Sequence, residues 1–460
     1  SEMCIRDRLW GAQNRRKNLF NSIEHGLILF PGNNPVPMNY PSNHLPFRQD
    51  SNFMYYCGLD VSHLNLVLDV EKGESILFGD DLSVDEIVWE GERTPIEQMA
   101  ELSGVDRFLS SSDLQTFIQK KDKAVHYLPL YRDDQKMFVS ELLNGTSNGA
   151  SRKLIQTVIR QRSIKSSDEL AEIELALDIT CEMHKIAMRQ TKDGMLEQSI
   201  VGAMEGFALS KGRRLAYPII FTIHGEILHS NVYTNVMHSG QLALNDSGSE
   251  SPLLYASDIT RTFPVNGKFS PTQKEIYQIV YNMQAVAFDY CKPGNSYKDA
   301  HLATARVAVE GLKSIGLMKG ETEQAVEAGA HALFFPHGLG HMLGLDVHDM
   351  EGLGEDLVGY DNKSERSDQF GLAYLRLAKK LEPGFVLTVE PGIYFIPHLI
   401  DQWQSNEKHK EFINYNALAP FRNFGGIRIE DNVVITEDGF RILGQHIPRT
   451  IDEIESIMAQ

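Results

Sequence analysis

Three histidines lie close together in the stretch from Phe335 to His348. His337, His341 and His348 are spaced by four and then seven residues, and glycines stand between them. Histidine is the commonest metal ligand and the side chain that titrates nearest to neutral pH, so this density indicates a reactive site. The glycines argue against one continuous helix. Taken alone, the stretch also fits a turn-rich surface loop, and oxygen ligands elsewhere must decide between the two interpretations.

Four carboxylates in strand-like runs supply those oxygens. Asp246 and Asp258 lie on two runs separated by glycine, serine and proline, a pattern that predicts a hairpin. Glu390 ends an apolar run, and Glu430 alternates with isoleucines so that it shares one face of its strand with Arg428. Aspartate is a poor strand former, so two of them in neighbouring strands require a reason. Each carboxylate by itself also fits an edge-strand or turn charge.

Together, the four carboxylates and one imidazole predict a metal centre. Packing four negative groups without partners would cost roughly several kcal/mol per charge, and two divalent cations would neutralise them. An oxygen-rich donor set with one histidine suits Mn²⁺ best among the first-row ions, with Co²⁺ or Zn²⁺ able to substitute.

The sequence around these residues resembles the pita-bread metallopeptidases that cleave Xaa-Pro bonds, aminopeptidase P and prolidase. The motifs that carry the resemblance are HGLGHMLGLDVHD, TVEPGIY, SDITRTFPVNGKF and GIRIEDNVVIT, and the similarity extends from Ile164 to the C-terminus. Residues 47–53, FRQDSNF, are similar to the creatinase-type N-terminal domain of the same enzymes. The resemblance implies an α/β creatinase-like N-terminal domain followed by an α+β pita-bread catalytic domain. The blocks of strands and helices agree with this and predict a largely antiparallel catalytic sheet.

The resemblance also implies a dinuclear metal site with five ligands. These are Asp246, Asp258, His341, Glu390 and Glu430. Asp258 and Glu430 correspond to the pair that bridges the metals. Positions that line the substrate or support the metals are matched by His229, His337, His348 and Arg428. The two aspartates lie twelve residues apart, one more than is usual in the family, which we interpret as an extra residue in the turn or a bulge.

The expected reaction is a two-metal hydrolysis. A hydroxide held between metals about 3.5–4 Å apart would attack the carbonyl before a prolyl nitrogen. One metal and a histidine, His337 or His348, would polarise that carbonyl and stabilise the oxyanion. The resemblance suggests that Glu390 passes the proton to the leaving nitrogen.

Prolidase and aminopeptidase P share this metal site, so the preference for dipeptides or for longer peptides must depend on the part of the substrate beyond the proline. Arg376 aligns with an arginine that binds the substrate's C-terminal carboxylate in dipeptide-cleaving relatives, and a guanidinium there favours short substrates. A surface position on a short helix is the alternative for Arg376. We therefore expect an Xaa-Pro dipeptidase, with aminopeptidase P, acting on longer peptides, as the alternative. A non-catalytic peptide-binding scaffold is more remote, because all five ligands are present.

Trp89 bears on the oligomeric state. It matches a tryptophan that reaches the partner's active site from the N-terminal domain in dimeric relatives, which implies substrate contact and a homodimer or a tetramer. A half-buried core position is the alternative.

Length and composition limit the domain organisation and the classes of binding partner. The 460 residues exceed one ordinary core, and we predict a disordered leader over 1–13, an N-terminal domain over 14–160 and a catalytic domain over 161–460. The small polar stretch 142–151 is the predicted linker. The net charge of −18 argues against nucleic-acid or anionic-membrane partners, and no apolar run reaches the roughly 20 residues that span a bilayer. Without a secretory signal, we expect a cytoplasmic protein with reduced, buried cysteines.

Overall fold

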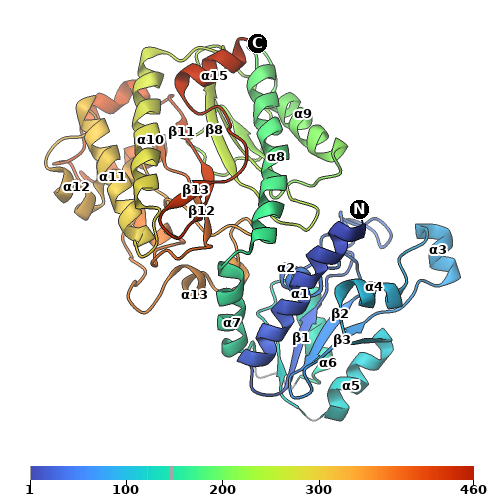
Figure 1. Cartoon of the computed structure of the whole chain (residues 1–460). Coiled ribbons are helices and arrows are strands. Elements are labelled where there is room, and N and C mark those ends of the chain that lie inside the picture. The colour runs from blue at the N-terminus through green and yellow to red at the C-terminus, as the bar shows by residue number, and fades with distance from the viewer. Residues whose placement is uncertain (1, 122, 146–148) are drawn as a thin grey trace. The chain divides into compact units, whose positions relative to one another are not determined.

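The computed structural model describes residues 2–121, 123–145 and 149–460, with the side chains of the first range described over 11–120. Contacts divide the chain into two compact units, Ser1–Arg162 and Ser163–Gln460, whereas the sequence placed the boundary after residue 160 (Figure 1). The predicted linker 142–151 falls inside the first unit, and its residues 146–148 lie outside the described residues.

The N-terminal unit is built on a mixed sheet with the strand order β4-β3-β2-β1-β5 (Figure 1). Its strands are β1 (Leu27–Pro31), β2 (Asn65–Asp69), β3 (Glu74–Phe78), β4 (Arg107–Leu109) and β5 (Val125–His126). β1, β2 and β3 form an antiparallel meander, and β4 and β5 add in parallel at its two edges. β1 is buried at every position, which explains why its sequence is a continuous apolar run without alternation.

Helices surround this sheet, and the first of them differs from the prediction. They are α1 (Glu2–Ser22), α2 (Ser51–Cys57), α3 (Val84–Glu90), α4 (Ile96–Ser103), α5 (Leu114–Lys121), α6 (Asp133–Leu142) and α7 (Arg152–Ser163). The leader expected to be disordered over 1–13 is helical from Glu2 onward. Arg16, only 1% exposed, anchors the helix by donating to the carbonyls of Tyr56, Ser103 and Gly104. Leu19, Phe20 and Ile23 form an apolar stripe that indicates a helix only from Arg15 onward, so periodicity missed the first part of α1.

The catalytic unit contains three small sheets. Their orders are β6-β7-β8, β10-β11 and β13-β12-β9. The strands are β6 (Ile220–Thr222), β7 (Leu242–Ser247), β8 (Ile259–Pro264), β9 (Val386–Val389), β10 (Gly392–Tyr394), β11 (Gly426–Arg428), β12 (Asp431–Ile435) and β13 (Phe440–Ile442). Each strand pair among the described residues of this unit is antiparallel, so the predicted antiparallel character is confirmed. An antiparallel bridge between Thr260 and Glu430 joins two of the sheets.

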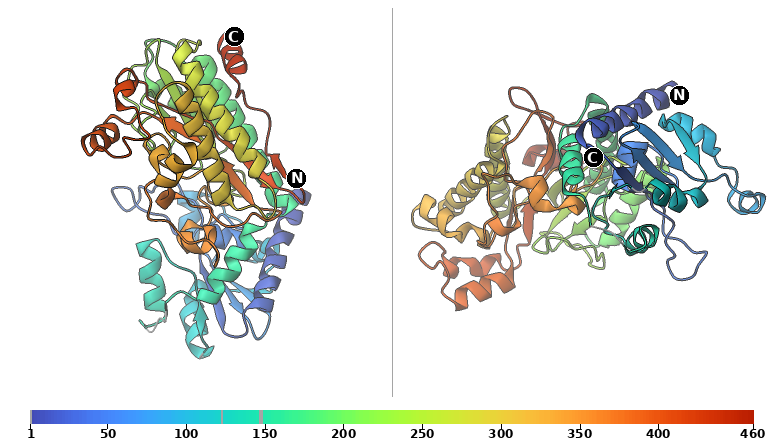
Figure 2. Two further views of the ribbon diagram at one scale, coloured as in Figure 1. Left: turned by 90° about the vertical axis from the view of Figure 1, so that its left-hand side faces the viewer. Right: turned by 90° about the horizontal axis from the view of Figure 1, so that it is seen from below.

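Helices from five to 24 residues long accompany these sheets. They are α8 (Ser167–Gln190), α9 (Glu197–Ser210), α10 (Pro271–Tyr290), α11 (Tyr297–Ser314), α12 (Thr322–Ala328), α13 (Glu355–Gly359), α14 (Pro397–Ser405) and α15 (Ile451–Met458). α8 packs on β7 and β8, while α10 packs on β9, β10 and β11. α10 and α11 lie side by side in the views of Figures 1 and 2. From Phe334 on, the sequence pattern indicates strands and loops with a closing helix at Ile451–Met458, which is α15, whereas the short helices α13 and α14 were not predicted.

Three cysteines, Cys57, Cys181 and Cys291, are buried free thiols, while the side chain of Cys4 lies outside the described residues. Among the helices that the structure describes, none combines the length and apolar composition needed to cross a lipid bilayer.

Buried histidines should make the catalytic unit sensitive to acid. Burial lowers the pKa of His184 and His331 to about 4 and lowers the pKa of His301 well below its usual value. The unfolded chain therefore binds more protons than the folded chain below about pH 6.5. The stability that neutral histidines contribute is fully present above that pH and is lost as the pH falls toward 4. Each histidine adds a slope of at most about 1.4 kcal/mol per pH unit.

The His331→Leu variant tests this effect. Neither ring nitrogen of His331 has a hydrogen-bond partner among the described residues, so leucine leaves no partner unpaired. Denaturant unfolding between pH 4 and pH 7 should show a shallower loss of stability than in the wild type, by up to about 1.4 kcal/mol per pH unit. His44→Gln, at an exposed position of the other unit, is the matched control. Equal slopes for His331→Leu and the wild type would contradict the assignment.

Candidate active site

The five predicted ligands come together in the catalytic unit. Asp246 lies on β7, Asp258 directly precedes β8, Glu390 directly follows β9, Glu430 directly precedes β12, and His341 lies in the irregular stretch after α12. Nε2 of His341 lies 3.4 Å from Oδ2 of Asp258 and 3.3 Å from Oε1 of Glu390. Ligand atoms of Asp258, His341 and Glu430 lie within 4.8 Å of one another. Strand ends thus bring residues of distant segments to one point.

Strand pairing fixes the two aspartates. In the hairpin of β7 and β8, Asp246 is paired with Thr260, and the predicted hairpin is confirmed. A further bridge between Glu250 and Ala256 continues the pairing toward the tip. At the tip, Leu254 has a φ of 66°, a left-handed conformation that is uncommon without glycine.

A close approach of two backbones positions His341. A Cβ on Gly340 would lie 2.0 Å from the carbonyl oxygen of Thr388 on β9, so only glycine fits there. The backbone N–H of His341 donates to Oγ1 of Thr388 at 3.0 Å. Nδ1 of His341 donates to the carbonyl of Met342 at 2.9 Å. A carbonyl only accepts, so the proton is on Nδ1 and Nε2 is left to face the carboxylates.

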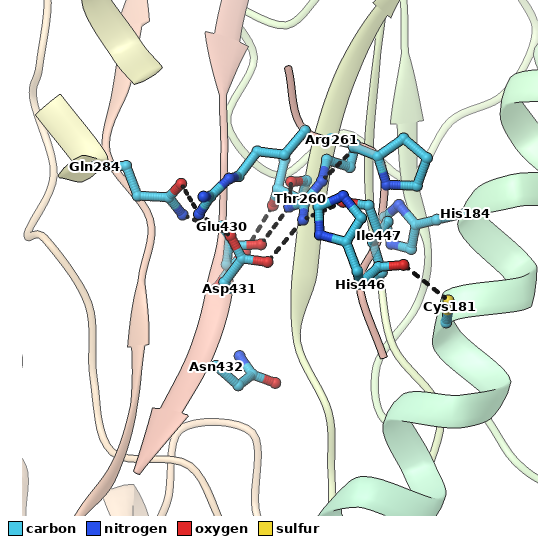
Figure 3. A network of polar contacts seen from close by, with 12 residues as sticks. Cys181, His184, Thr260, Arg261, Gln284, Glu430, Asp431, Asn432, His446 and Ile447 are labelled. Carbon is cyan, nitrogen blue, oxygen red and sulfur yellow. Dashed lines mark hydrogen bonds and ion pairs between the residues drawn. The ribbon is translucent and has the colours of Figure 1, made fainter. Parts of the chain in front are cut away.

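A polar network behind the ligands holds Glu430 in place (Figure 3). Oγ1 of Thr260 donates to Oε2 of Glu430 at 2.6 Å. Arg261, 1% exposed, donates to the carbonyl of Glu430 and forms an ion pair with Asp431, both at 2.7 Å. Gln284 of α10 donates to the other oxygen of Asp431 at 2.9 Å. The position of Glu430 therefore depends on β8, β12 and α10 together.

The cluster carries more negative charge than the protein neutralises. Burial raises the pKa of Asp246 and Asp258, and it raises the pKa of Glu390 and Glu430 well above the usual value, with the neighbouring carboxylates adding to the effect. Arg428 forms an ion pair with Asp246 at 2.7 Å. Among the described residues, no lysine or arginine pairs with the other three carboxylates.

These residues fit a divalent metal centre. Oε1 of Glu430 is buried and has no hydrogen-bond partner among the described residues, although an unpaired buried carboxylate oxygen is strongly unfavourable. The Oη atom of Tyr217 lies 2.5 Å from Oδ1 of Asp246 and 2.6 Å from Oδ1 of Asp258, but it has one proton and cannot donate to both. Bound cations would satisfy the orphan oxygen and the crowded carboxylates together. No sequence pattern indicated Tyr217, which reaches the ligands only through the pairing of β6 with β7.

His337 is held by a chain of hydrogen bonds. Its Nδ1 donates to the carbonyl of Gly338, and its Nε2 accepts from the hydroxyl of Tyr394, both at 2.7 Å. The same hydroxyl accepts from Nη1 of Arg428 at 2.9 Å. Both ring nitrogens of His337 are therefore occupied by the protein. Tyr394 ends the TVEPGIY motif, but no role was predicted for it.

One ring nitrogen of His348 has no hydrogen-bond partner among the residues that the structure describes. Its Nδ1 donates to Oε2 of Glu351 at 2.7 Å, and its ring centroid lies 4.4 Å from that of His341. Burial lowers the pKa of His348 to about 4. Nε2 remains for a ligand in the cavity.

A cavity of about 380 Å³ lies in front of these groups. Its walls include the metal-ligand candidates Asp246, His341 and Glu390 and also the predicted substrate residues His229, His337, His348, Arg376 and Arg428. Leu228, Phe370, Tyr374, Ile396 and Leu399 add an apolar wall. Trp89 belongs to the other unit, where it is 88% exposed on α3, which excludes the half-buried core position.

Comparison with known proteins identifies the domains. The model of metallopeptidase family M24 matches residues 171–437, and the model of the aminopeptidase P N-terminal domain matches residues 12–127. The Xaa-Pro dipeptidase of Rattus norvegicus is 35% identical over 426 residues, covering 90% of this chain and 85% of the relative. A protein of Uncinocarpus reesii named probable Xaa-Pro aminopeptidase is 30% identical over 450 residues, covering 95% and 90%.

Solved structures agree with the sequence relatives. The structure of zinc-substituted aminopeptidase P of E. coli in complex with product has a TM-score of 0.82 and 31% identity, and the match covers 98% of both chains. The family and the fold class predicted from the motifs are thereby confirmed. With an aminopeptidase P N-terminal domain followed by a matched catalytic domain, the chain belongs to metallopeptidase family M24.

Proposed function

We propose that this protein is a metal-dependent peptidase that hydrolyses the bond before proline and prefers Xaa-Pro dipeptides. The observation that carries the proposal is the convergence of Asp258, His341 and Glu430 within 4.8 Å, beside a cavity that also contains Arg376. The relatives named Xaa-Pro dipeptidase and Xaa-Pro aminopeptidase support the bond specificity. Their identities of 35% and 30% are too similar to separate the two activities.

The five ligand candidates would hold two divalent ions, for which we propose Mn²⁺ because the donors are four carboxylates and one imidazole. When bound, such ions activate water and polarise a carbonyl as Lewis acids. Asp258 and Glu430, which match the family's bridging pair and whose ligand atoms lie within 4.8 Å of each other, would be the shared ligands. Tyr217 and Thr260 orient these carboxylates through hydrogen bonds at 2.6 Å.

Side chains around the metal-ligand candidates are proposed to carry the remaining steps of the reaction. Glu390, whose Oε1 accepts only from Thr388 at 3.1 Å among the described residues, is proposed to carry the proton to the departing prolyl nitrogen. Of the two histidines expected to contact the substrate carbonyl, His348 is proposed to face the substrate; because its proton is on Nδ1, its Nε2 accepts a hydrogen bond or a proton there. His337 was the equal alternative for that role, but both of its nitrogens are engaged, so we propose that it orients Tyr394 and Arg428 instead.

Arg376 supports the preference for dipeptides. Its Nη1 donates to Glu351 at 2.9 Å and to Glu355 at 2.8 Å. Among the described residues, no group accepts a hydrogen bond from Nε or Nη2 of Arg376. This edge of the guanidinium can bind a carboxylate with two parallel hydrogen bonds. The free carboxylate of an Xaa-Pro dipeptide fits that edge, whereas a longer peptide has a neutral amide at the same place.

The Arg376→Ala variant should separate the two substrates. Loss of a charge-assisted pair at the substrate carboxylate is expected to lower kcat/KM for an Xaa-Pro dipeptide by about tenfold to 100-fold. Cleavage of the matching Xaa-Pro-Yaa tripeptide should change at most a few-fold, because that peptide does not have the carboxylate at this position. Steady-state kinetics with both peptides on manganese-loaded protein provides the measurement. Equal losses on both peptides would favour the aminopeptidase P alternative.

We further propose that exposed Trp89 contacts substrate in a second copy of the chain, within a homodimer or a tetramer. Its exposure of 88% supports an intermolecular role, since a tryptophan is rarely left in solvent. The scaffold alternative is disfavoured because all five ligand candidates are present and grouped.

A further inference from the structure

One carboxylate contacts two side chains of the active-site cavity. Oε2 of Glu351 accepts a hydrogen bond from Nδ1 of His348 at 2.7 Å, and Oε1 of Glu351 accepts one from Nη1 of Arg376 at 2.9 Å. His348 and Arg376 both line the cavity in front of the metal-ligand candidates. Glu351 thus joins the histidine proposed to accept from the substrate through Nε2 to the arginine proposed to bind the end of the substrate.

The backbone is bent to bring Glu351 back toward His348. Met350, between them, has a φ of 62° and is 1% exposed. A left-handed conformation is uncommon for a residue with a side chain and persists when packing holds it. The backbone N–H of Glu351 donates to the carbonyl of His348 at 3.2 Å, which closes the turn. Glu351 therefore starts from a fixed backbone position.

The arginine is fixed from a second side. Glu355 accepts from the same Nη1 of Arg376 at 2.8 Å but does not contact His348. Glu355 also pairs with Arg366, which donates to the carbonyls of Ala373 and Leu375 at 2.8 and 3.2 Å. The segment that carries Arg376 is thus held by two glutamates, and only Glu351 also reaches the histidine.

This arrangement determines which atoms are left for a substrate. A carboxylate only accepts hydrogen bonds, so His348 has its proton on Nδ1, and Nε2, which has no hydrogen-bond partner among the described residues, is left as an acceptor. Burial opposes ionisation of Glu351, but Arg376 and His348 together hold its pKa below the usual value, so it remains an acceptor at neutral pH. Because Nη1 is held, the Nε–Nη2 edge of Arg376 has a defined direction.

We propose that Glu351 is a positioning residue that fixes His348 and Arg376 relative to each other, and thereby matches the active site to a substrate that ends at the proline. The inference rests on the Xaa-Pro peptidase function proposed above. Without Glu351, Arg376 keeps its contact with Glu355, but His348 loses the side-chain acceptor that sets its tautomer. Without Glu351, we expect kcat to fall because His348 is less well oriented. We expect the KM for dipeptides to rise because Arg376 is less well placed.

The Glu351→Ala variant tests the proposal with an Xaa-Pro dipeptide and the matching tripeptide on manganese-loaded protein. We expect kcat to fall about tenfold on both peptides, because His348 is no longer held. We expect KM to rise about tenfold for the dipeptide alone, because Arg376 is less well placed. The side chain of Glu351 is 46% exposed, so the variant should fold, and its thermal unfolding and metal content are measured beside the kinetics.

Two further variants separate the contacts. Glu355→Ala removes a partner of Arg376 without touching His348, so it should raise the dipeptide KM without the fall in kcat that both peptides show in Glu351→Ala. In the background of Arg376→Ala, Glu351→Ala should still lower kcat but no longer raise the dipeptide KM, because coupled residues act non-additively.

The outcomes are distinct. A Glu351→Ala protein with full metal content and kinetic constants within about twofold of the wild type overturns the role of Glu351. An equal loss on both peptides that accompanies lowered metal content or lowered thermal stability also overturns it, because a purely structural role is then sufficient. A wild-type protein that cleaves neither peptide overturns the proposed function and this inference with it.

Discussion

Replacing Glu390 by glutamine should abolish turnover while leaving the protein folded. The variant keeps the size of the side chain and one oxygen, but it removes the group that is proposed to carry the proton to the leaving nitrogen. General acid–base catalysis contributes roughly 100-fold to 10,000-fold, so we expect kcat to fall by at least about 1,000-fold once weaker metal binding is added. Steady-state cleavage of an Xaa-Pro dipeptide measures the effect.

The metal content of the variant separates loss of the proton carrier from loss of the metal ions. Elemental analysis of Glu390→Gln should find at least one of the two ions retained, because four ligand candidates remain. Glu437→Gln, at an exposed position of the same unit, is the matched control and should retain wild-type activity. A Glu390→Gln protein that holds both ions and turns over at the wild-type rate would exclude Glu390 as the proton carrier.

Among the variants proposed for this protein, Lys165→Met should produce the largest loss of stability. Nζ of Lys165 lies 2.8 Å from Oδ2 of Asp349, and both side chains are 1% exposed. Asp349 directly precedes Met350 in the turn that carries His348 and Glu351. Breaking a buried ion pair by removing one partner typically costs about 3–5 kcal/mol. Denaturant unfolding at pH 7 measures the change in the free energy of unfolding.

The paired variant supplies the control. Lys165→Met combined with Asp349→Leu removes both charges, so it should recover a large part of the lost stability. Lys410→Met, which breaks the exposed pair with Glu407, should change stability little. A Lys165→Met protein as stable as the wild type would show that this buried pair does not hold the turn.

Motif and strand patterning predicted much of the site. Asp246 and Asp258 were found because aspartate in a strand-like run contradicts strand propensity, and that conflict is typical of functional positions. The hairpin of β7 and β8 was predicted by its turn residues. These signals are local, so they are visible in a single sequence.

The contacts between side chains were not predicted, because they join distant segments. Tyr217 and Asp258 are 41 residues apart, His337 and Tyr394 are 57 apart, and both pairs meet only after the sheets form. The interpretation of His337 changed for this reason. α14 was missed because its nine residues are fewer than the window over which periodicity separates a helix from other structure.

The central proposal is that the grouped carboxylates and His341 hold the metal ions of a peptidase, and that this peptidase hydrolyses the bond before proline. The most direct measurement is the initial rate of cleavage of Ala-Pro, Ala-Pro-Ala and Ala-Ala by one preparation, after chelation and again after addition of Mn²⁺. We predict that the manganese-loaded protein cleaves Ala-Pro faster than Ala-Pro-Ala, leaves Ala-Ala intact, and loses all activity on chelation. Failure of the manganese-loaded protein to cleave either proline peptide, or undiminished cleavage after chelation, would contradict this function.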